Sequence, residues 1–244
     1  MSSYASLARW YDELTADVPY EEIADFYEAV FAGHSRPVHT VLDFCCGTGA
    51  MTGILARRGY DLTATDASSD MLAEAAAKLS QLETATPPLL LCQEASQLDL
   101  NDTVDAAVCC LDSINYLPPE ELDAVFVRLA LFISPGGLLI FDINSPERLR
   151  SLDGGTFVDE REGLLCLWRA QLDEQLHALV YGVDLFSQRG RLWSREQEEH
   201  VEYLHEPELL LQRLARAGFV HAVRRTDGPQ HEQGREFYIA ERKS

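Results

Sequence analysis

Hydrophobic and polar residues follow two different patterns along this chain. Up to residue 150, short apolar runs at 38–44, 62–65, 89–93, 104–111 and 138–143 alternate with stretches of helical periodicity. Runs of this length that are bounded by Gly, Pro and polar residues predict buried strands. Strands that alternate with helices predict an α/β domain with a parallel, doubly wound sheet. Segments 19–32, 122–132 and 207–217 have the apolar spacing of amphipathic helices, and Ser68 or Ser69 would cap a further helix that ends near Leu79.

A different pattern occupies residues 156–203. Apolar and polar residues alternate with a period of two over 164–172, 177–186 and 192–203, and turn-forming residues separate these segments. This alternation predicts antiparallel hairpins. We interpret residues 151–203 as a small antiparallel β lobe inserted after strand five, beside the mouth of a ligand pocket. Its most interesting polar residues are Arg195, His200, Glu202 and His205.

The first apolar run leads directly into a turn that contains Gly47, Thr48 and Gly49. Glycine has no Cβ, so the backbone at such a turn can take a positive φ and approach a ligand closely. About twenty residues later, a second short strand ends in Asp66. A carboxylate at that offset commonly binds the hydroxyls of a ribose. These features predict a nucleoside-binding βαβ unit.

The spacing of the glycines indicates which nucleoside is bound. A dinucleotide-binding turn has the pattern Gly-x-Gly-x-x-Gly, but here the third glycine, Gly53, comes one residue late. Asp43 precedes the turn, and its carboxylate would repel a pyrophosphate while suiting a ligand that carries an ammonium group and no phosphate. S-adenosylmethionine is such a ligand. A turn that binds nothing, or that binds a nicotinamide cofactor in an oxidoreductase, is the alternative.

The sequence Val41-Leu-Asp-Phe-Cys-Cys-Gly-Thr-Gly49 resembles motif I of the class I S-adenosylmethionine-dependent methyltransferases. The sequences Asp-Ser-Ile-Asn-Tyr-Leu from 112 and Pro-Gly-Gly from 135 also resemble this family, and most closely a subgroup of small bacterial methyltransferase domains. One departure is Cys45, which stands where the family has its first glycine and implies a slightly altered turn. The resemblance implies a Rossmann-like, doubly wound, seven-stranded sheet with an antiparallel final strand. We expect an N-terminal helical lid at 1–35, a cofactor-binding domain at 36–150 and 204–244, and the lobe at 151–203.

The resemblance also implies a set of cofactor-binding residues. Asp66 would bind the ribose, Met71 would pack on the adenine with Glu94 and Ala95 nearby, and the Leu111 carbonyl would accept from the methionine ammonium. Asp112 and Asn115 follow the fourth strand, where they would contact the methionine portion or instead cap the next helix through an Asx turn. The full expected set is Tyr4, Tyr11, Asp43, Cys45, Gly47, Thr48, Gly49, Asp66, Ala67, Met71, Glu94, Ala95, Leu111, Asp112 and Asn115.

Methyl transfer from a sulfonium is an in-line displacement, so the protein mainly aligns the reactants and removes water from them. A base is needed only for a protonated acceptor. The candidate catalytic residues are Tyr11, Tyr116 and His200, with His205 as a further candidate base, and the sequence does not rank them. Tyr11 is also a candidate aromatic wall near the sulfonium.

Composition narrows the choice of acceptor. The net charge is −20, which disfavours phosphate-backbone partners and favours a small-molecule acceptor methylated at O, N or C over DNA or RNA. We find no apolar run of membrane-spanning length, no signal-peptide core and no spaced metal-ligand pairs, so we expect a cytoplasmic enzyme without a metal, as a monomer or homodimer. An RNA (including tRNA) methyltransferase and a non-catalytic S-adenosylmethionine-binding protein are the alternatives.

Overall fold

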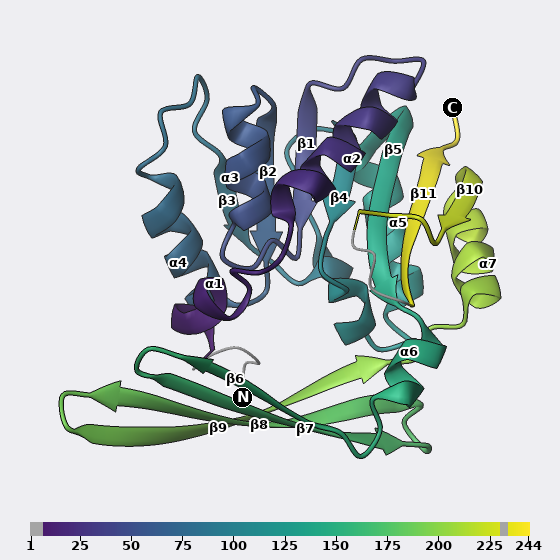
Figure 1. Cartoon of the computed structure of the whole chain (residues 1–244). Coiled ribbons are helices and arrows are strands. Elements are labelled where there is room, and N and C mark those ends of the chain that lie inside the picture. The colour runs from purple at the N-terminus through teal and green to yellow at the C-terminus, as the bar shows by residue number, and fades with distance from the viewer. Residues whose placement is uncertain (1–6, 230–233) are drawn as a thin grey trace.

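Two β-sheets organise the chain (Figure 1). The computed structural model describes residues 7–229 and 234–244, so the expected contact of Tyr4 lies outside the described residues. The larger sheet has seven strands in the order β10-β11-β5-β4-β1-β2-β3. Its strands are β1 (Thr40–Phe44), β2 (Asp61–Asp66), β3 (Leu89–Cys92), β4 (Val104–Cys109), β5 (Ile133–Asn144), β10 (Phe219–Arg225) and β11 (Arg235–Arg242).

The strand pairing confirms the expected doubly wound arrangement. Strands β1 to β5 run parallel to one another, and β11 runs antiparallel to both of its neighbours, β5 and β10. Strand β1 lies between β2 and β4, so the order of the strands reverses at β1. In sheets of this kind, ligands bind beyond the carboxyl ends of the strands that flank the reversal. The ends of β1, β2 and β4 are therefore where the site is expected.

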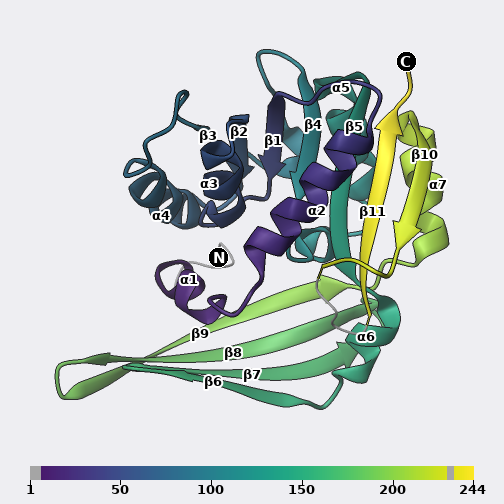
Figure 2. The ribbon, with the colours of Figure 1, turned by 45° about the horizontal axis from the view of Figure 1, so that its top comes forward.

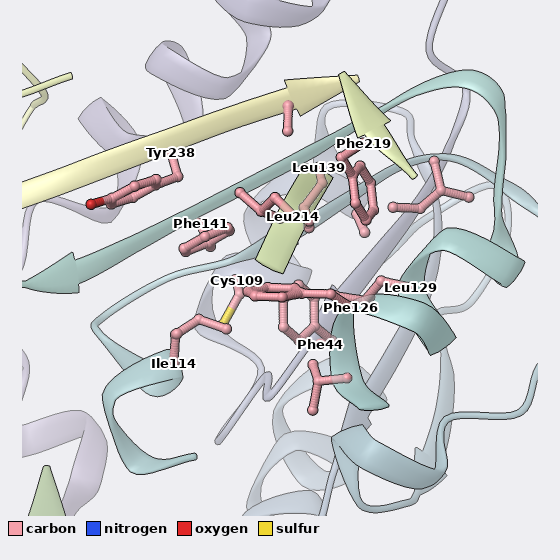
Figure 3. Close-up of a cluster of buried hydrophobic side chains, with 14 of the residues drawn as sticks. Phe44, Cys109, Ile114, Phe126, Leu129, Leu139, Phe141, Leu214, Phe219 and Tyr238 are labelled. Carbon is pink, nitrogen blue, oxygen red and sulfur yellow. The ribbon is translucent and has the colours of Figure 1, made fainter. Parts of the chain in front are cut away.

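Helices cover both faces of the larger sheet. They are α2 (Tyr20–Gly33), α3 (Ala50–Arg57), α4 (Ser69–Leu79), α5 (Leu122–Phe132) and α7 (Pro207–Ala217). Successive residues of a strand point to opposite faces, so the two sides of β1 join different cores: Leu42 packs with α5 and α7, whereas Val41 packs with α2 and α3. On the first face, Phe141 of β5 stacks on Tyr238 of β11 with ring centroids 5.1 Å apart (Figure 3).

The smaller sheet contains four antiparallel strands in the order β6-β7-β8-β9. They are β6 (Thr156–Arg161), β7 (Leu164–Asp173), β8 (Ala178–Arg189) and β9 (Leu192–Tyr203), and α6 (Pro146–Ser151) leads into them from β5. This sheet lies across one end of the larger one, with the N-terminal helix α1 (Tyr11–Leu14) between them (Figures 1 and 2). Leu7, Leu149 and Leu204 pack on its apolar side chains. This sheet confirms the predicted antiparallel β lobe after strand five. It has one strand, β6, that the sequence analysis did not predict as a separate strand.

Element boundaries differ from the prediction where the chain bends. Strand β4 ends at Cys109 rather than at 111, and the next residues include Leu111 and Asp112 with φ of 57° and 50°. Strand β5 begins at Ile133, so Pro135 and its two following glycines belong to the strand, beside a register shift against β4. The helices at 122–132 and 207–217 were predicted with the observed bounds. In the described parts of the chain, no helix is both long and apolar enough to cross a membrane.

Asn115 joins the two sheets. It lies fully buried in a 3-10 turn (Ser113–Tyr116) and uses both ends of its amide. Its Nδ2 donates to the carbonyl oxygens of Asn144 and Tyr203 at 3.1 and 3.0 Å, and its Oδ1 accepts from the backbone N of Asn144 at 2.9 Å. Asn144 is the last residue of β5 in the larger sheet, and Tyr203 is the last residue of β9 in the smaller sheet. The Asn115 side chain therefore joins one strand end of each sheet to the loop after β4.

We expect Asn115→Ala to lower the free energy of unfolding by about 2–4 kcal/mol, because buried backbone groups that lose a partner cost about 1–3 kcal/mol each. Urea unfolding measures this loss. Ser113→Ala is the control: it removes a hydroxyl from the same turn that donates to Cys110 O and joins neither sheet. A loss below about 1 kcal/mol in Asn115→Ala would contradict the bracing role.

Candidate active site

The turn after β1 is held in a left-handed conformation. Cys45, Gly47 and Gly49 have φ of 56°, 55° and 73°. Glycine takes this conformation easily, whereas it costs a non-glycine residue about 1–2 kcal/mol. Cys45 is therefore strained in this turn. Its side chain packs against the main core. The turn is further fixed by the N–H of Cys46, which donates to Thr65 O on β2 at 3.0 Å.

Asp66 fastens the turn to the end of β2. Its Oδ2 accepts from the backbone N of Gly47 at 2.8 Å, and its Oδ1 accepts from the backbone N of Ser68 at 2.8 Å. Ser68 in turn caps α4 by accepting from the N of Met71. Burial raises the pKa of Asp66 while the backbone donors oppose that rise. Each carboxylate oxygen retains a second lone pair, so the group can still accept from a ligand hydroxyl.

A cavity of about 520 Å³ opens over this turn. The ends of β1, β2, β3 and β4 form its wall, as the reversal of strand order predicts, and α1, α2 and β9 contribute further residues. Eleven of the predicted residues line it: Tyr11, Cys45, Gly47, Thr48, Asp66, Ala67, Met71, Glu94, Ala95, Leu111 and Tyr116. A Cβ built on Gly47 would meet no atom within 4 Å, so the backbone there borders open space.

Asp43 lies beneath the turn. Its side chain is buried, and Oδ2 accepts a short hydrogen bond from the Thr52 hydroxyl. Within the described residues, Oδ1 has no hydrogen-bond partner. Burial raises the pKa of Asp43 to about 7, against the opposing effect of the Thr52 hydroxyl. Such a group would gain from a cationic ligand, because a nearby positive charge favours the ionised carboxylate.

A second cavity of about 390 Å³ adjoins the first. Tyr11, Leu111 and Tyr116 line both cavities, so these three residues mark where they meet. The second cavity lies between the N-terminal segment, the loop after β4 and the smaller sheet. Its other walls include five aliphatic or aromatic side chains and five charged ones: Leu14, Leu152, Phe157, Trp168, Tyr181, Asp112, Arg148, Asp159, Glu202 and Arg235.

Arg235 and Asp142 hold the loop after β4 in place. Asp142 accepts from the backbone N of Asp112 at 3.0 Å, and Arg235 Nη1 forms ion pairs with Asp142 and, at 2.7 Å, with Asp112 Oδ1. This cluster stabilises the left-handed residues Leu111 and Asp112. Burial raises the pKa of Asp142, and Arg235 opposes the rise.

Asp12 links the N-terminal segment to the turn after β1. Its Oδ1 accepts from the Thr48 hydroxyl at 2.6 Å, and its Oδ2 lies 2.6 Å from Lys78 Nζ on α4. These contacts position α1, which begins with Tyr11, over the junction of the cavities. In the described residues, the N-terminal segment therefore brings Tyr11 to both cavities, and its role as a lid stays a prediction.

Four described residues of the expected cofactor-binding set lie outside the first cavity. Asp112 lines the second cavity and is paired with Arg235, rather than lining the first. Neither Gly49 nor Asn115 is among the residues lining a cavity. Gly49 allows close packing of α3 on α4, since a Cβ there would lie 3.1 Å from Ala75 Cβ. Asn115 uses its amide to join the two sheets. Asp43 lies below the cavity wall.

His200 and His205 are buried. His200 Nε2 lies 3.1 Å from Glu198 Oε2, and its ring centroid lies 6.0 Å from those of Tyr116 and Trp168. His200 is therefore behind Tyr116 rather than on a cavity wall. His205 Nε2 lies 3.1 Å from Ile114 O, and burial lowers its pKa to about 4. Arg195 pairs with Asp184, away from both cavities.

Sequence reasoning missed several site residues. In the sequence, Asp142 stands out weakly as a site residue, because it is a single acid near the end of an otherwise apolar strand. Arg235, Trp168 and Tyr181 do not stand out, because only the folded chain brings β11 and the smaller sheet to the loop after β4. In the described residues, no group of three or more His, Cys, Asp or Glu side chains is arranged to hold a metal ion.

Comparisons with known proteins agree with this geometry. A family profile for methyltransferase domains matches residues 41–137. A putative methyltransferase of Bacillus subtilis, YqeM, is 29% identical over 224 residues, which cover 90% of this chain and 88% of the relative. The crystal structure of an S-adenosylmethionine-dependent methyltransferase from Clostridium acetobutylicum is 28% identical, with a TM-score of 0.85 and 99% of each chain covered. Together these similarities indicate a class I S-adenosylmethionine-dependent methyltransferase.

The fold extends to more distant relatives. The sugar N-methyltransferase KedS8 from a Streptoalloteichus species has a TM-score of 0.81 and 24% identity, with 96% of this chain and 93% of that chain covered, which shows a shared fold. The family profile and the similar crystal structure indicate S-adenosylmethionine as the cofactor of this chain. The residues present fit that cofactor, because Asp43 has a buried oxygen without a partner and the backbone of Gly47 borders open space.

We expect Gly47→Ala to abolish binding of S-adenosylhomocysteine, because the added methyl group enters the first cavity. The left-handed φ should also cost about 1–2 kcal/mol of stability. Gly190→Ala is the matched control, since Gly190 has φ of 63°, has no atom within 4 Å of a built Cβ, and lies in the β8–β9 turn. Calorimetric titration should show binding lost in Gly47→Ala alone. Equal binding in both variants would contradict the placement of the cofactor.

We expect Asp43 to make the protein less stable as pH rises. Its pKa is raised from an ordinary value of 3.8 to about 7, so its stabilising effect is complete below pH 3.8 and is lost as pH rises through 7. Asp43→Asn removes this titration. When the free energy of unfolding is measured from pH 5 to 8, the stability of wild type should therefore fall relative to that of Asp43→Asn as pH rises. Parallel curves for the two proteins would show that Asp43 does not titrate in this range.

Proposed function

We propose that this methyltransferase transfers a methyl group from S-adenosylmethionine to a small molecule bound in the second cavity. The observation that carries the proposal is the shared wall of Tyr11, Leu111 and Tyr116. A cofactor in the first cavity and an acceptor in the second would meet at this wall. Methyl transfer needs such an arrangement, because donor and acceptor must be aligned in line and shielded from water.

In the first cavity, each group of residues would contact a different part of S-adenosylmethionine. Asp66 would accept from the ribose hydroxyls, Met71 would pack on the adenine, and Glu94 and Ala95 would lie near its edge. The turn at Gly47 and Thr48 would border the amino-acid portion. The Leu111 carbonyl would accept a hydrogen bond from the ammonium group of the cofactor. The buried Asp43 carboxylate would attract the positive charge of that group from beneath the turn. When bound, the cofactor supplies an activated methyl group on a sulfonium.

Tyr11 and Tyr116 are the residues of the predicted catalytic set that border both cavities. Their rings would exclude water from the junction and favour the positive charge of the sulfonium. His200 would act through Tyr116, whose ring it contacts edge-on, and is a positioning residue in this proposal. Residues 151–203 would then be the part of the chain that selects the acceptor, because they supply the floor of the second cavity.

The size and charge of the protein favour a small acceptor. A cavity of about 390 Å³ suits a molecule of modest size. The net charge of −20 opposes a nucleic-acid substrate, whose phosphates would be repelled.

We expect Asp66→Ala to weaken S-adenosylhomocysteine binding by at least about tenfold, because hydrogen bonds to a charged group contribute about 1.5–3 kcal/mol. Titration calorimetry with ligand-free protein measures this change. Asp61→Ala is the control, since Asp61 is exposed at the opposite end of the same strand. Failure of wild-type protein to bind S-adenosylhomocysteine would overturn the proposed function. Unchanged binding in Asp66→Ala would overturn the ribose contact.

A further inference from the structure

Glu202 carries a carboxyl group to which the proposed function assigns no role. It lies on β9, is 5% exposed, and lines the second cavity. Among the described residues, Asn144 alone hydrogen-bonds to it, with Nδ2 donating to Oε2 at 3.1 Å. Oε1 is therefore available to a ligand. A buried carboxyl with spare hydrogen-bonding capacity on a cavity wall calls for a ligand partner, because burial of such a group is otherwise costly.

The carboxyl groups around Glu202 are engaged with the protein itself. Asp112 is paired with Arg235, and Asp159 accepts from Trp168 Nε1 at 2.9 Å. Glu198, on the same face of β9, accepts from the backbone N of Leu7 and lies beside His200. Glu202 thus differs from Asp112, which is paired with an arginine, because in the described residues the single side-chain hydrogen bond to the Glu202 carboxyl comes from the neutral amide of Asn144.

The surroundings of Glu202 combine acids and aromatic rings. The groups that face it are Asp112 from the loop after β4, Asn144 from β5, Arg148 from α6, Tyr181 from β8 and Arg235 from β11. Arg235 is already shared by two carboxylates, Asp112 and Asp142. The rings of Trp168 and Tyr181 lie edge to face in the same cavity, 6.2 Å apart. Such walls attract a cation carried on an apolar framework.

We propose that the acceptor is an amine whose nitrogen binds the Glu202 carboxyl, and that Glu202 takes up the proton that the nitrogen must lose. This inference rests on the proposed function, since it places the acceptor in the second cavity. The ammonium form of the acceptor donates a proton to the Glu202 carboxylate, which leaves a lone pair on nitrogen. That lone pair forms the new N–C bond while the S–C bond breaks and its electron pair stays on sulfur. The methylated nitrogen carries the positive charge, and Glu202 later releases its proton to water.

Proton affinities favour an amine over other acceptors. Burial, followed by the nearby Asp112, raises the pKa of Glu202 to about 8. An alkylammonium has a pKa of about 10, as in lysine, so proton transfer to Glu202 is only modestly uphill. A hydroxyl holds its proton far more tightly, since the pKa of water is about 16. An anionic acceptor would meet three carboxyl groups, those of Glu202, Asp112 and Asp159, against the two guanidinium groups of Arg148 and Arg235.

Binding of three benzyl compounds tests this proposal without knowledge of the natural acceptor. Benzylamine, benzyl alcohol and benzoate share one ring and differ in charge. We expect benzylamine to bind the protein saturated with S-adenosylhomocysteine at least about tenfold more tightly than benzyl alcohol, as a charge-assisted hydrogen bond allows. Benzoate should bind more weakly than either. Calorimetry or ligand-observed NMR measures all three.

Glu202→Gln separates the role of the charge from that of packing. Glutamine keeps the shape and the acceptor for Asn144 Nδ2, so the fold should be retained. We expect the preference for benzylamine over benzyl alcohol to fall to about threefold or less. Glu196→Gln is the matched control on the same face of β9, where Glu196 pairs with Arg9 outside the cavity, and it should keep the preference. In wild type, benzylamine affinity should rise between pH 6 and 8, and in Glu202→Gln it should stay flat.

Each outcome is decisive for one claim. Preference for benzoate, absence of benzylamine binding at 10 mM (about the weakest affinity expected of a small fragment), or a preference that survives in Glu202→Gln overturns the amine assignment. Binding of S-adenosylhomocysteine in wild type and in both variants shows that the cofactor site is intact in those cases. Loss of S-adenosylhomocysteine binding in wild type would instead contradict the proposed function itself.

Discussion

The hydrogen bond from the Gly47 N–H to Asp66 is the contact on which the site depends. It fastens the turn after β1 to the end of β2, and the Cys46 N–H donates to Thr65 O beside it. The strand order reverses at β1, so the carboxyl ends of β1, β2 and β4 open on one side of the sheet. The cavity over the turn follows from this geometry, and the left-handed Cys45 shows that the chain accepts strain there to keep it.

The second requirement is that the loop after β4 stays in place. Leu111 and Asp112 are both left-handed, and the ion pairs of Arg235 with Asp112 and Asp142 stabilise that conformation. Asn115 adds hydrogen bonds to the ends of β5 and β9. Because Leu111 and Tyr116 belong to this loop region and line both cavities, the same contacts set the position where cofactor and acceptor would meet. In the function that we propose, the larger sheet would hold the cofactor and the smaller sheet would select the acceptor.

Local signals explain what could be predicted from sequence. The helices at 122–132 and 207–217 have clear periodicity, and the Ser68 cap was identified because its hydroxyl accepts locally. The motif from Asp43 to Gly49 predicted the turn, and Asp66 was found from its offset. The antiparallel lobe followed from its alternation, although β6 was not distinguished.

Distant contacts explain what could not be predicted. Nothing near Asp112 in the sequence indicates that Arg235, on the last strand, will pair with it. Asn115 was assigned to the ligand because polar residues after a strand often bind one, but its amide was needed to join two sheets. Gly49 matched the motif and yet serves the packing of α3 on α4.

The structure of the complex with S-adenosylhomocysteine, determined crystallographically, tests the central claim most directly. We expect the ribose hydroxyls at Asp66 and the sulfur at the junction formed by Tyr11, Leu111 and Tyr116, with its lone pair directed into the second cavity. A nucleoside that occupies the second cavity, or a sulfur directed away from that junction, would contradict the assignment of one cavity to the cofactor and the other to the acceptor.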